Sequence, residues 1–305
     1  MNTTTVNLVP KRNKNFVAWG HFKDIRAIIM SQKFVPVFIT GLSGNGKTFM
    51  VEQVCASIGK ECVRVNITRE TDEDDLLGGF RLKDGNTVFE DGPVVTAMRR
   101  GAVLLLDEVD LGTEKMMCLQ PILEGNPVYL KKTNEVVEPA PGFTIIATAN
   151  TKGQGSVSGK FIGTNILNEA FLERFSFTLE QEYPPAATEK NILNKQLGDD
   201  GCEDPDFSNV LVQWANLTRD SYASGACSEI ISTRRLTHIC QAYSIFGMKR
   251  EKAVKICLNR FDEDTKESMF EFYTKIDEKI QTERAEAAAK KQETLNKKDE
   301  EASAA

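Results

Sequence analysis

Residues 34 to 59, "FVPVFITGLSGNGKTFMVEQVCASIG", decide the fold of this chain. The first seven of them are rich in β-branched and aromatic side chains and end at a glycine, which is typical of a short buried strand. The stretch that starts at Thr48 has helical apolar spacing. Between the two, "GLSGNGKT", residues 41 to 48, fits the pattern G-x-x-x-x-G-K-[ST] in the strand–loop–helix context that a phosphate-binding loop requires.

The loop residues predict how a nucleotide is held. Backbone N–H groups from about Gly44 to Thr48 are expected to surround the β-phosphate, and the helix N-terminus adds partial positive charge. Lys47 is expected to reach the β- and γ-phosphates, and the Thr48 hydroxyl to hold Mg²⁺. ATP and Mg²⁺ are therefore the predicted cofactors. The predicted nucleotide-contacting residues are Gly41, Ser43, Gly44, Asn45, Gly46, Lys47, Thr48 and Phe49.

A second motif, "GAVLLLDEVD" at residues 101 to 110, is apolar up to its acidic end, as expected of a strand buried between two layers of helices. Asp107 is the predicted metal ligand, and Glu108 is placed to polarise the attacking water as a general base. A surface acidic pair is the alternative, but it does not explain the order of the strands. Asp110 is interpreted as a helix N-terminal residue rather than a third catalytic acid.

Two further strands, 62 to 68 and 143 to 150, alternate with helical stretches and predict a mostly parallel sheet between helices. Pro184 and Pro185 end this pattern because neither they nor the preceding residue fit inside a helix. The fold class is thus an α/β domain followed by a small all-α domain. The helices expected in the second domain are 186 to 197, 207 to 219, 232 to 247 and 250 to 279.

The stretch "GGFRLKDGNTVFEDGP", residues 78 to 93, reads as a β-hairpin around an Asp84-Gly85 turn. Pairing outward from the turn sets Lys83 opposite Asn86, Leu82 opposite Thr87 and Phe80 opposite Phe89. A second hairpin is expected within 126 to 139. The predicted domains are a flexible arm (1–15), an α/β core with the two hairpins (16–183; hairpins about 78–92 and 126–139), a helical lid (184–274) and a charged helical or disordered tail (275–305).

Composition excludes several function classes. The formal net charge of the 305 residues is −6, so no global positive field attracts nucleic acid. No segment has the length and apolarity of a signal peptide or a membrane span. The seven cysteines form no C-x-x-C pair and only two histidines accompany them, which favours reduced thiols over zinc ligation. A cytoplasmic protein without a membrane partner is expected.

From about residue 20 to 245 the chain resembles the AAA+ ATPases, and among them the group of MoxR proteins and the small ATPase subunit of cobalt chelatase (CobS). The ordered set of stretches carries the resemblance: "GLSGNGKT", "DLLGGFRLKDGNTVFEDGPVVTAMRRG", "LLLDEVD", "LEGNPVYL", "IIATANT", "LNEAFLERF" and "STRRL".

The resemblance implies further site residues. Asn150 matches sensor 1, whose amide orients the lytic water, although an Asn capping a strand end is the alternative. Arg174 matches the arginine finger that reaches the γ-phosphate of the neighbouring subunit, with a surface salt bridge as the alternative. Arg234 matches the sensor 2 arginine, with Arg235 as the other candidate. Arg99 and Arg100 are interpreted as a solvated pair rather than interface residues.

The resemblance also implies an assembly and a function: a homo-oligomeric ring, with six subunits expected, that hydrolyses ATP and remodels a protein partner with a von Willebrand factor A-type domain. Both hairpins would project toward the pore of the ring, unless they only pack between subunits. Two other functions stay open. One is a nucleic-acid motor that uses Arg81, Lys83, Lys131 and Lys132 at the hairpins; the other is a scaffold in which nucleotide only joins the subunits.

Overall fold

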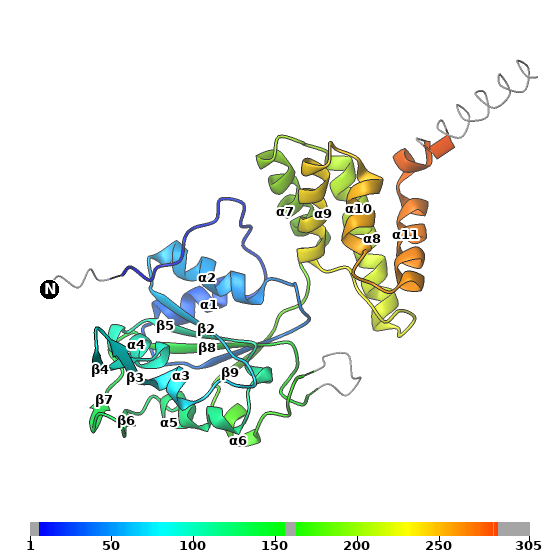
Figure 1. Ribbon diagram of the computed structural model, residues 1–305. Coiled ribbons are helices and arrows are strands. Elements are labelled where there is room, and N and C mark those ends of the chain that lie inside the picture. The colour runs from blue at the N-terminus through cyan, green and yellow to red at the C-terminus, as the bar shows by residue number, and fades with distance from the viewer. Residues whose placement is uncertain (1–5, 156–162, 283, 286–305) are drawn as a thin grey trace, which may run out of the picture. The chain divides into compact units, whose positions relative to one another are not determined.

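The computed structural model describes residues 6–155, 163–282, 284 and 285. The chain divides into two compact units, Met1–Tyr183 and Pro184–Ala305 (Figure 1). Each unit is described by itself. No helix in the described ranges is long and apolar enough to cross a membrane.

Unit 1 is built on a five-stranded sheet in the order β2-β5-β8-β1-β9, in which every neighbouring pair is parallel. Its strands are β1 (Val37–Thr40), β2 (Cys62–Asn66), β5 (Val103–Asp107), β8 (Thr144–Ala149) and β9 (Phe177–Glu180). The predicted fold class, a mostly parallel sheet between helices followed by a helical part, is confirmed. Strand β9 was not predicted, because it is short and three of its four side chains are exposed, which leaves no apolar pattern to detect.

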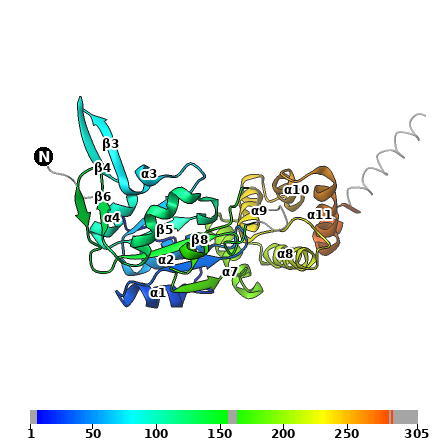
Figure 2. The same cartoon turned by 90° about the horizontal axis from the view of Figure 1, so that it is seen from below.

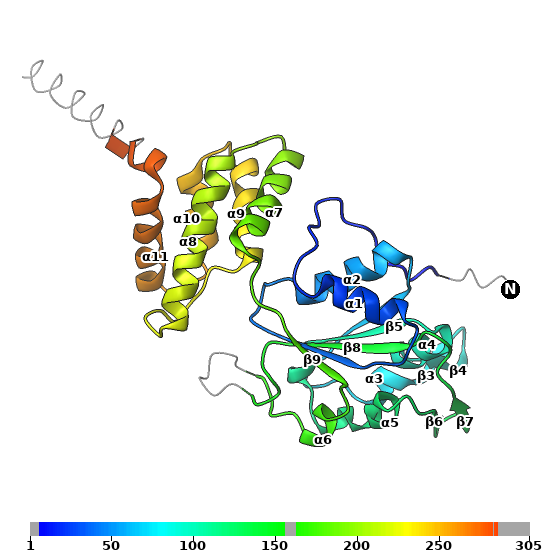
Figure 3. The same ribbon diagram turned by 180° about the vertical axis from the view of Figure 1, so that it is seen from behind.

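Helices cover both faces of this sheet (Figures 1 and 3). On one face lie α1 (Phe22–Met30) and α2 (Lys47–Ile58); the other face carries α3 (Glu73–Leu77), α4 (Pro93–Arg100), η2 (Glu114–Leu119), α5 (Gln120–Leu123) and α6 (Glu169–Leu172). Strand alternation sorts the core accordingly. Val103 and Leu105 of β5 pack in the cluster that contains α1 and α2, whereas Leu104 and Leu106 pack in the cluster that contains α4.

The first hairpin, β3 (Gly78–Lys83) and β4 (Asn86–Asp91), lies between α3 and α4. Its register is the predicted one, with Phe80 opposite Phe89 and Lys83 opposite Asn86. Both turn residues, Asp84 and Gly85, have positive φ, as a two-residue turn matched to the strand twist requires. Figure 2 shows this ribbon standing away from the sheet. The second hairpin is β6 (Val128–Leu130) and β7 (Glu135–Val137).

The described part of the N-terminal arm and the paired arginines both make contacts within unit 1. The described part of the expected flexible arm binds the domain: Leu8 accepts from the Cys62 amide, and the buried Gln53 side chain bonds the backbone at Lys11 and Asn13. Arg99 and Arg100, interpreted as a solvated pair, are exposed and half-buried respectively, and both form ion pairs. Arg99 forms ion pairs with Asp91 and Glu135. Arg100 binds Glu61, and this hydrogen bond lowers the pKa of Glu61.

Unit 2 is all helical, with α7 (Ala186–Asp199), α8 (Pro205–Ala223), α9 (Thr233–Ile245), α10 (Arg250–Leu258) and α11 (Glu263–Ile276). The single helix expected over 250 to 279 is therefore wrong. The chain turns at 259 to 262, where Phe261 enters the core and the Asp262 carboxylate caps α11 by accepting from the Thr265 amide. Most of the expected tail, residue 283 and residues 286 to 305, lies outside the described residues.

A buried ion pair joins three helices of unit 2. The Glu189 carboxylate on α7 is fully buried and accepts two hydrogen bonds from the Arg219 guanidinium on α8, at 2.8 and 2.9 Å. The hydroxyl of Thr233, the first residue of α9, donates to the same carboxylate. Removing one charged partner of such a pair leaves the other buried without compensation, which is far costlier than losing an exposed pair.

We predict that Glu189→Ala destabilises unit 2 by about 3–5 kcal/mol because Arg219 loses its partner. The measurement is denaturant unfolding followed by the fluorescence of the buried Trp214, with Trp19 replaced by Phe. The matched control is Glu229→Ala, which breaks the exposed pair with Arg260 and should cost less than about 1 kcal/mol. Equal losses in the two variants would contradict a structural role of the buried pair.

Candidate active site

The phosphate-binding loop connects β1 to α2 and contains backbone conformations that need glycine. Gly46 precedes α2 with φ 89°, and Gly41 has φ 145°. A Cβ at Gly41 would lie 2.1 Å from the Gln181 carbonyl oxygen, so no side chain fits there. The predicted nucleotide-contacting residues from Gly41 to Gly46 form this loop, and Lys47, Thr48 and Phe49 form the first turn of α2. The amide groups at the helix start are thus positioned for an anion.

Lys47 is buried beneath the loop. Its amine donates to the carbonyl oxygens of Gly41 and Leu42 at 2.6 and 3.1 Å. It also donates to Oδ1 of Asn150 at 3.2 Å. The structure therefore brings together the predicted phosphate-binding lysine and the predicted sensor 1 residue, although 103 positions separate them in the chain. The strand order explains this, because β1 and β8 are neighbours.

Asp107, at the carboxyl end of β5, receives donors from three other elements. Its Oδ1 accepts from the hydroxyls of Thr48 on α2, at 2.6 Å, and Thr148 on β8. Its Oδ2 accepts from the Arg64 guanidinium on β2 at 2.6 Å. Although burial opposes it, Asp107 together with Glu52 raises the pKa of Arg64. The two predicted metal ligands, Thr48 and Asp107, are therefore in direct contact.

This donor set fits Mg²⁺. The ion usually takes one or two carboxylates together with substrate phosphates, rather than an all-protein cage. The described residues contain no cluster of three His, Cys, Asp or Glu side chains that could hold a metal. Thr48 and Asp107, beside a phosphate-binding loop, match the arrangement in which a carboxylate and substrate phosphates share the ion.

Glu108 has an unusual backbone. Its φ is 57°, in the left-handed region, which costs a residue other than glycine on the order of 1–3 kcal/mol. The Glu108 amide donates to the Thr148 hydroxyl at 3.3 Å, and its side chain is exposed. The turn carries the carboxylate out of the strand, next to Asp107, where it can meet a water molecule.

Asp110 is a helix N-terminal residue, as interpreted from the sequence, but the helix is short and the carboxylate has a further role. Asp110 lies within the short η1 helix (Val109–Leu111) and is fully buried. Its Oδ2 accepts from the backbone amides of Asn150 and Thr151 and from the Thr151 hydroxyl, each at 3.0 Å. Asp110 therefore ties the loop after β5 to the loop after β8. Sequence reasoning missed this because a carboxylate three residues beyond a strand carries no sign of its distant partners.

Arg174 lies one residue beyond the C-cap of α6 and contacts a different part of unit 1. It forms an ion pair with Glu124, at 2.8 Å, and also donates to the Ala170 carbonyl. None of its hydrogen bonds among the described residues reaches the phosphate-binding loop or Asp107. The salt bridge that was the alternative for Arg174 is therefore present. It holds Arg174 outside the site of its own chain.

The two candidates for sensor 2 differ in their surroundings within unit 2. Arg235 donates to the Cys257 carbonyl at 3.2 Å, and burial together with nearby Arg260 lowers its pKa. Arg234 is exposed, and no side-chain partner for it is found among the described residues. Arg235 thus takes part in the internal structure of the unit, and Arg234 is the one available to a ligand.

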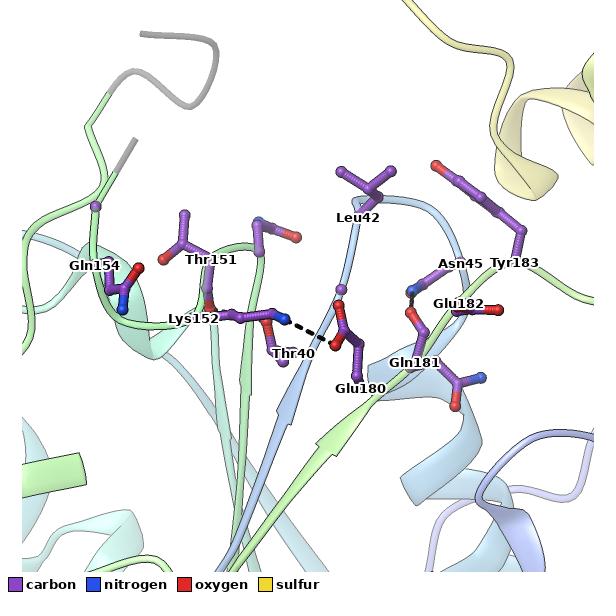
Figure 4. A pocket seen from close by; sticks show the side chains of 13 residues that line it. Thr40, Leu42, Asn45, Thr151, Lys152, Gln154, Glu180, Gln181, Glu182 and Tyr183 are labelled. Carbon is purple, nitrogen blue, oxygen red and sulfur yellow. Dashed lines mark hydrogen bonds and ion pairs between the residues drawn. The ribbon is translucent and has the colours of Figure 1, made fainter. Parts of the chain in front are cut away.

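A pocket of about 600 Å³ opens at the carboxyl ends of β1, β8 and β9. Figure 4 shows Asn45 directed to Gln181, and Lys152 directed to Glu180, its ion-pair partner at 2.8 Å. The Tyr183 hydroxyl donates to the Ser43 carbonyl at 2.8 Å. The pocket has the position at which open α/β sheets bind ligands, beyond the carboxyl ends of the strands.

Comparisons with known proteins agree with this geometry. A family model described as the AAA domain of the dynein-related subfamily matches residues 36–175. The aerobic cobaltochelatase subunit CobS of Sinorhizobium sp is 32% identical over 69% of this chain and 66% of its own length. NorQ of Paracoccus denitrificans is 31% identical over 73% of this chain and 78% of its own. Midasin of Giardia intestinalis is 32% identical, but the match covers 46% of this chain and only 3% of midasin.

Among solved structures, the RuvB Holliday junction branch migration motor of Thermotoga maritima gives a TM-score of 0.53 at 14% identity, over 86% of this chain and 75% of its own. That likeness concerns the fold. The parallel sheet, the phosphate-binding loop and the acidic strand end define the class of the protein as an AAA+ P-loop ATPase fold. Within that class the chain belongs to the group that contains CobS and the MoxR-like NorQ, which confirms the resemblance stated above.

We predict that Asp110→Ala lowers kcat for ATP hydrolysis by about 10²-fold, because Asn150 loses the anchor that sets its position. ATP affinity should change less than about threefold, since Asp110 touches none of the phosphate-binding residues. Asp110→Asn keeps an oxygen acceptor for the same amides and should recover most of kcat. Steady-state kinetics and equilibrium nucleotide binding measure both quantities.

Glu114→Ala, which removes an exposed carboxylate from η2 nearby, is the control and should behave as the parent protein. The positioning role of Asp110 is wrong if kcat and affinity fall together, or if Asp110→Asn is as inactive as Asp110→Ala.

Proposed function

We propose that this protein is a Mg²⁺-dependent ATPase that works as a ring, with six subunits expected, and uses hydrolysis to remodel a protein partner. The observation that carries the proposal is the convergence of four side chains from three parts of the chain: the start of α2, the end of β5 and the loop after β8. Lys47 contacts Asn150, and Thr48 contacts Asp107, in one continuous site at the carboxyl ends of the strands. Each of the four residues has a distinct task in phosphoryl transfer.

The chemistry follows from the contacts. The amides at the start of α2 would bind the β-phosphate, and the Lys47 amine would exchange its carbonyl partners for phosphate oxygens. Mg²⁺, held by Thr48 and Asp107, would neutralise charge on the phosphates. The Glu108 carboxylate would accept a proton from the attacking water, and the Asn150 amide would orient that water.

We assign the arginine finger to Arg174 and the sensor 2 role to Arg234. Arg174 is bound away from the site of its own chain, which supports action on the adjacent subunit. A guanidinium suits this role because it stays charged and offers several donors in fixed geometry. Arg234 is preferred to Arg235, because Arg235 is bound to the end of α10.

The nucleic-acid motor is disfavoured because three of the four hairpin cations have acidic partners. Lys83 pairs with Glu90, while Lys131 and Lys132 pair with Glu73 and Asp74. The hairpins also expose apolar side chains: Phe80 by 51%, Leu82 by 80%, Tyr129 by 51% and Val136 by 58%. Such a surface suits a protein partner better than a phosphate backbone.

The conformation of Glu108 favours hydrolysis over the alternative of a scaffold in which nucleotide only joins the subunits. A strained backbone is retained at that position, and strain of this kind clusters at functional sites. The relative named as a cobaltochelatase subunit supports a partner protein in the same class of system, for which we propose a von Willebrand factor A-type domain. The described residues show no feature specific to a tetrapyrrole, so metal insertion is not part of the proposal.

The shared site is tested by mixing two inactive variants. Lys47→Ala should lose nucleotide binding, and Arg174→Ala should bind ATP but turn over slower by on the order of 10³-fold. Mixed rings contain junctions with an intact pocket on one side and an intact finger on the other, so activity should return. A mixture no more active than its parts, while mixed rings are shown to form by crosslinking, rejects the shared site.

The role of the first hairpin is tested by comparing substitutions on its two faces. In the predicted register Phe80 and Leu82 lie on one face, and Arg81 and Lys83 on the other. The Phe80→Ser, Leu82→Ser variant should keep basal hydrolysis and lose partner capture, measured by pull-down in a Glu108→Gln background that holds ATP. Arg81→Ser, Lys83→Ser is the matched control and should keep capture. Loss of single-strand binding in the control, with capture intact in both, would instead support the nucleic-acid motor.

A further inference from the structure

Glu124 lies at the end of α5, in a turn that leaves it little freedom. Gly125 follows with φ 76°, and a Cβ there would lie 2.9 Å from the ring of Phe34. The Gly125 and Asn126 amides close the turn by donating to carbonyls of α5. The Asn126 side chain donates to Oε2 of Glu124 at 3.1 Å. The carboxylate is therefore braced from its own side.

The other oxygen of this carboxylate holds Arg174. Oε1 of Glu124 accepts from Nε of Arg174 at 2.8 Å, and Nη1 donates to the Ala170 carbonyl. No partner of Nη2 is found among the described residues. The main chain is also fixed, because Phe171 and Phe175 on either side are buried in the core with their rings 5.5 Å apart. The Nε and Nη1 atoms of the guanidinium are thus bound, and Nη2 remains available to another acceptor.

We propose that Glu124 is the positioning residue of Arg174, and that it orients the guanidinium so that the Nη2 edge faces the nucleotide of the adjacent subunit. This inference rests on the proposed finger role of Arg174. Its physical basis is entropy: an arginine side chain loses up to about 2 kcal/mol of rotamer freedom when ordered. A carboxylate that orders it in advance removes that cost from the transition state.

The contact has an opposite interpretation, in which Glu124 restrains Arg174 and must release it. The two predict opposite results. If Glu124 positions the finger, its removal slows hydrolysis; if it restrains the finger, its removal accelerates hydrolysis. The bound atoms favour positioning, because Glu124 and Ala170 take Nε and Nη1 and leave Nη2 for another oxygen.

The test compares three substitutions of Glu124 in the full chain under ring-forming conditions. Glu124→Ala should lower kcat about tenfold with ATP affinity unchanged, because the finger is disordered but present. Glu124→Gln keeps an oxygen for Nε and should recover most of kcat. Glu124→Asp keeps the charge but withdraws the carboxylate by one methylene, and should resemble Glu124→Ala. Glu173→Ala, an exposed carboxylate adjacent to Arg174 with no hydrogen bond to it, should have no effect.

A double-mutant cycle separates this inference from the proposed function. In an Arg174→Ala background, Glu124→Ala should have no further effect on kcat. If Arg174→Ala itself leaves turnover intact in assembled rings, the finger assignment fails. If Arg174→Ala is inactive while Glu124→Ala is as fast as the parent or faster, Glu124 does not position it. Additive losses of kcat in the double mutant would also overturn the inference. Glu124→Gln preserves the size of the side chain and Glu124→Asp preserves its charge, so the test remains valid if Glu124→Ala does not fold.

Discussion

The site depends on the Asp107 carboxylate at the end of the central part of the sheet. Three donors from three elements meet it: Arg64 from β2, Thr148 from β8 and Thr48 from α2. This convergence requires the strand order, because β5 lies between β2 and β8, so that both neighbours present side chains at the same edge. A buried carboxylate without such donors would be strongly destabilising. The donors that satisfy Asp107 also hold it against Thr48, so one set of contacts serves both the stability of the sheet and the proposed metal site.

The end of β5 is connected to the two hairpins through hydrogen bonds, ion pairs and the helix α4. Asp110, three residues beyond Asp107, fixes the Asn150 loop, and α4 leads directly into β5. Arg99, in the last turn of α4, pairs with Asp91 of the first hairpin and Glu135 of the second. The two insertions are thus linked to each other and to the helix that precedes the acidic strand. A partner that displaces the hairpins would have a contiguous set of packed elements through which to act on β5.

Local rules explain what the sequence predicted, and long-range contacts explain what it did not. The phosphate-binding loop, the acidic strand end and the register of the first hairpin depend on glycine conformation and on patterns within a few residues, and these were predicted. Arg64, Asp110 and Glu124 acquire their roles only from partners 43, 40 and 50 positions away. Strand β9 and the turn at Phe261 were missed for a related reason. Pairing with β1 and burial of one aromatic ring determine them, and neither leaves a periodic signal in the chain.

The charges around the phosphate-binding loop bear on the role proposed for Arg174. Near the phosphate-binding loop, Arg64 pairs with Asp107 and Glu52, and Lys152 pairs with Glu180. The Lys47 amine donates to oxygens of Gly41, Leu42 and Asn150. Phosphoryl transfer spreads negative charge over the γ-phosphate oxygens. In the proposed mechanism, a further fixed cation would stabilise this charge in addition to Lys47 and the metal ion. The Nη2 edge of Arg174, whose Nε atom is bound by Glu124, would supply that cation to another copy of the chain if the proposed finger role holds.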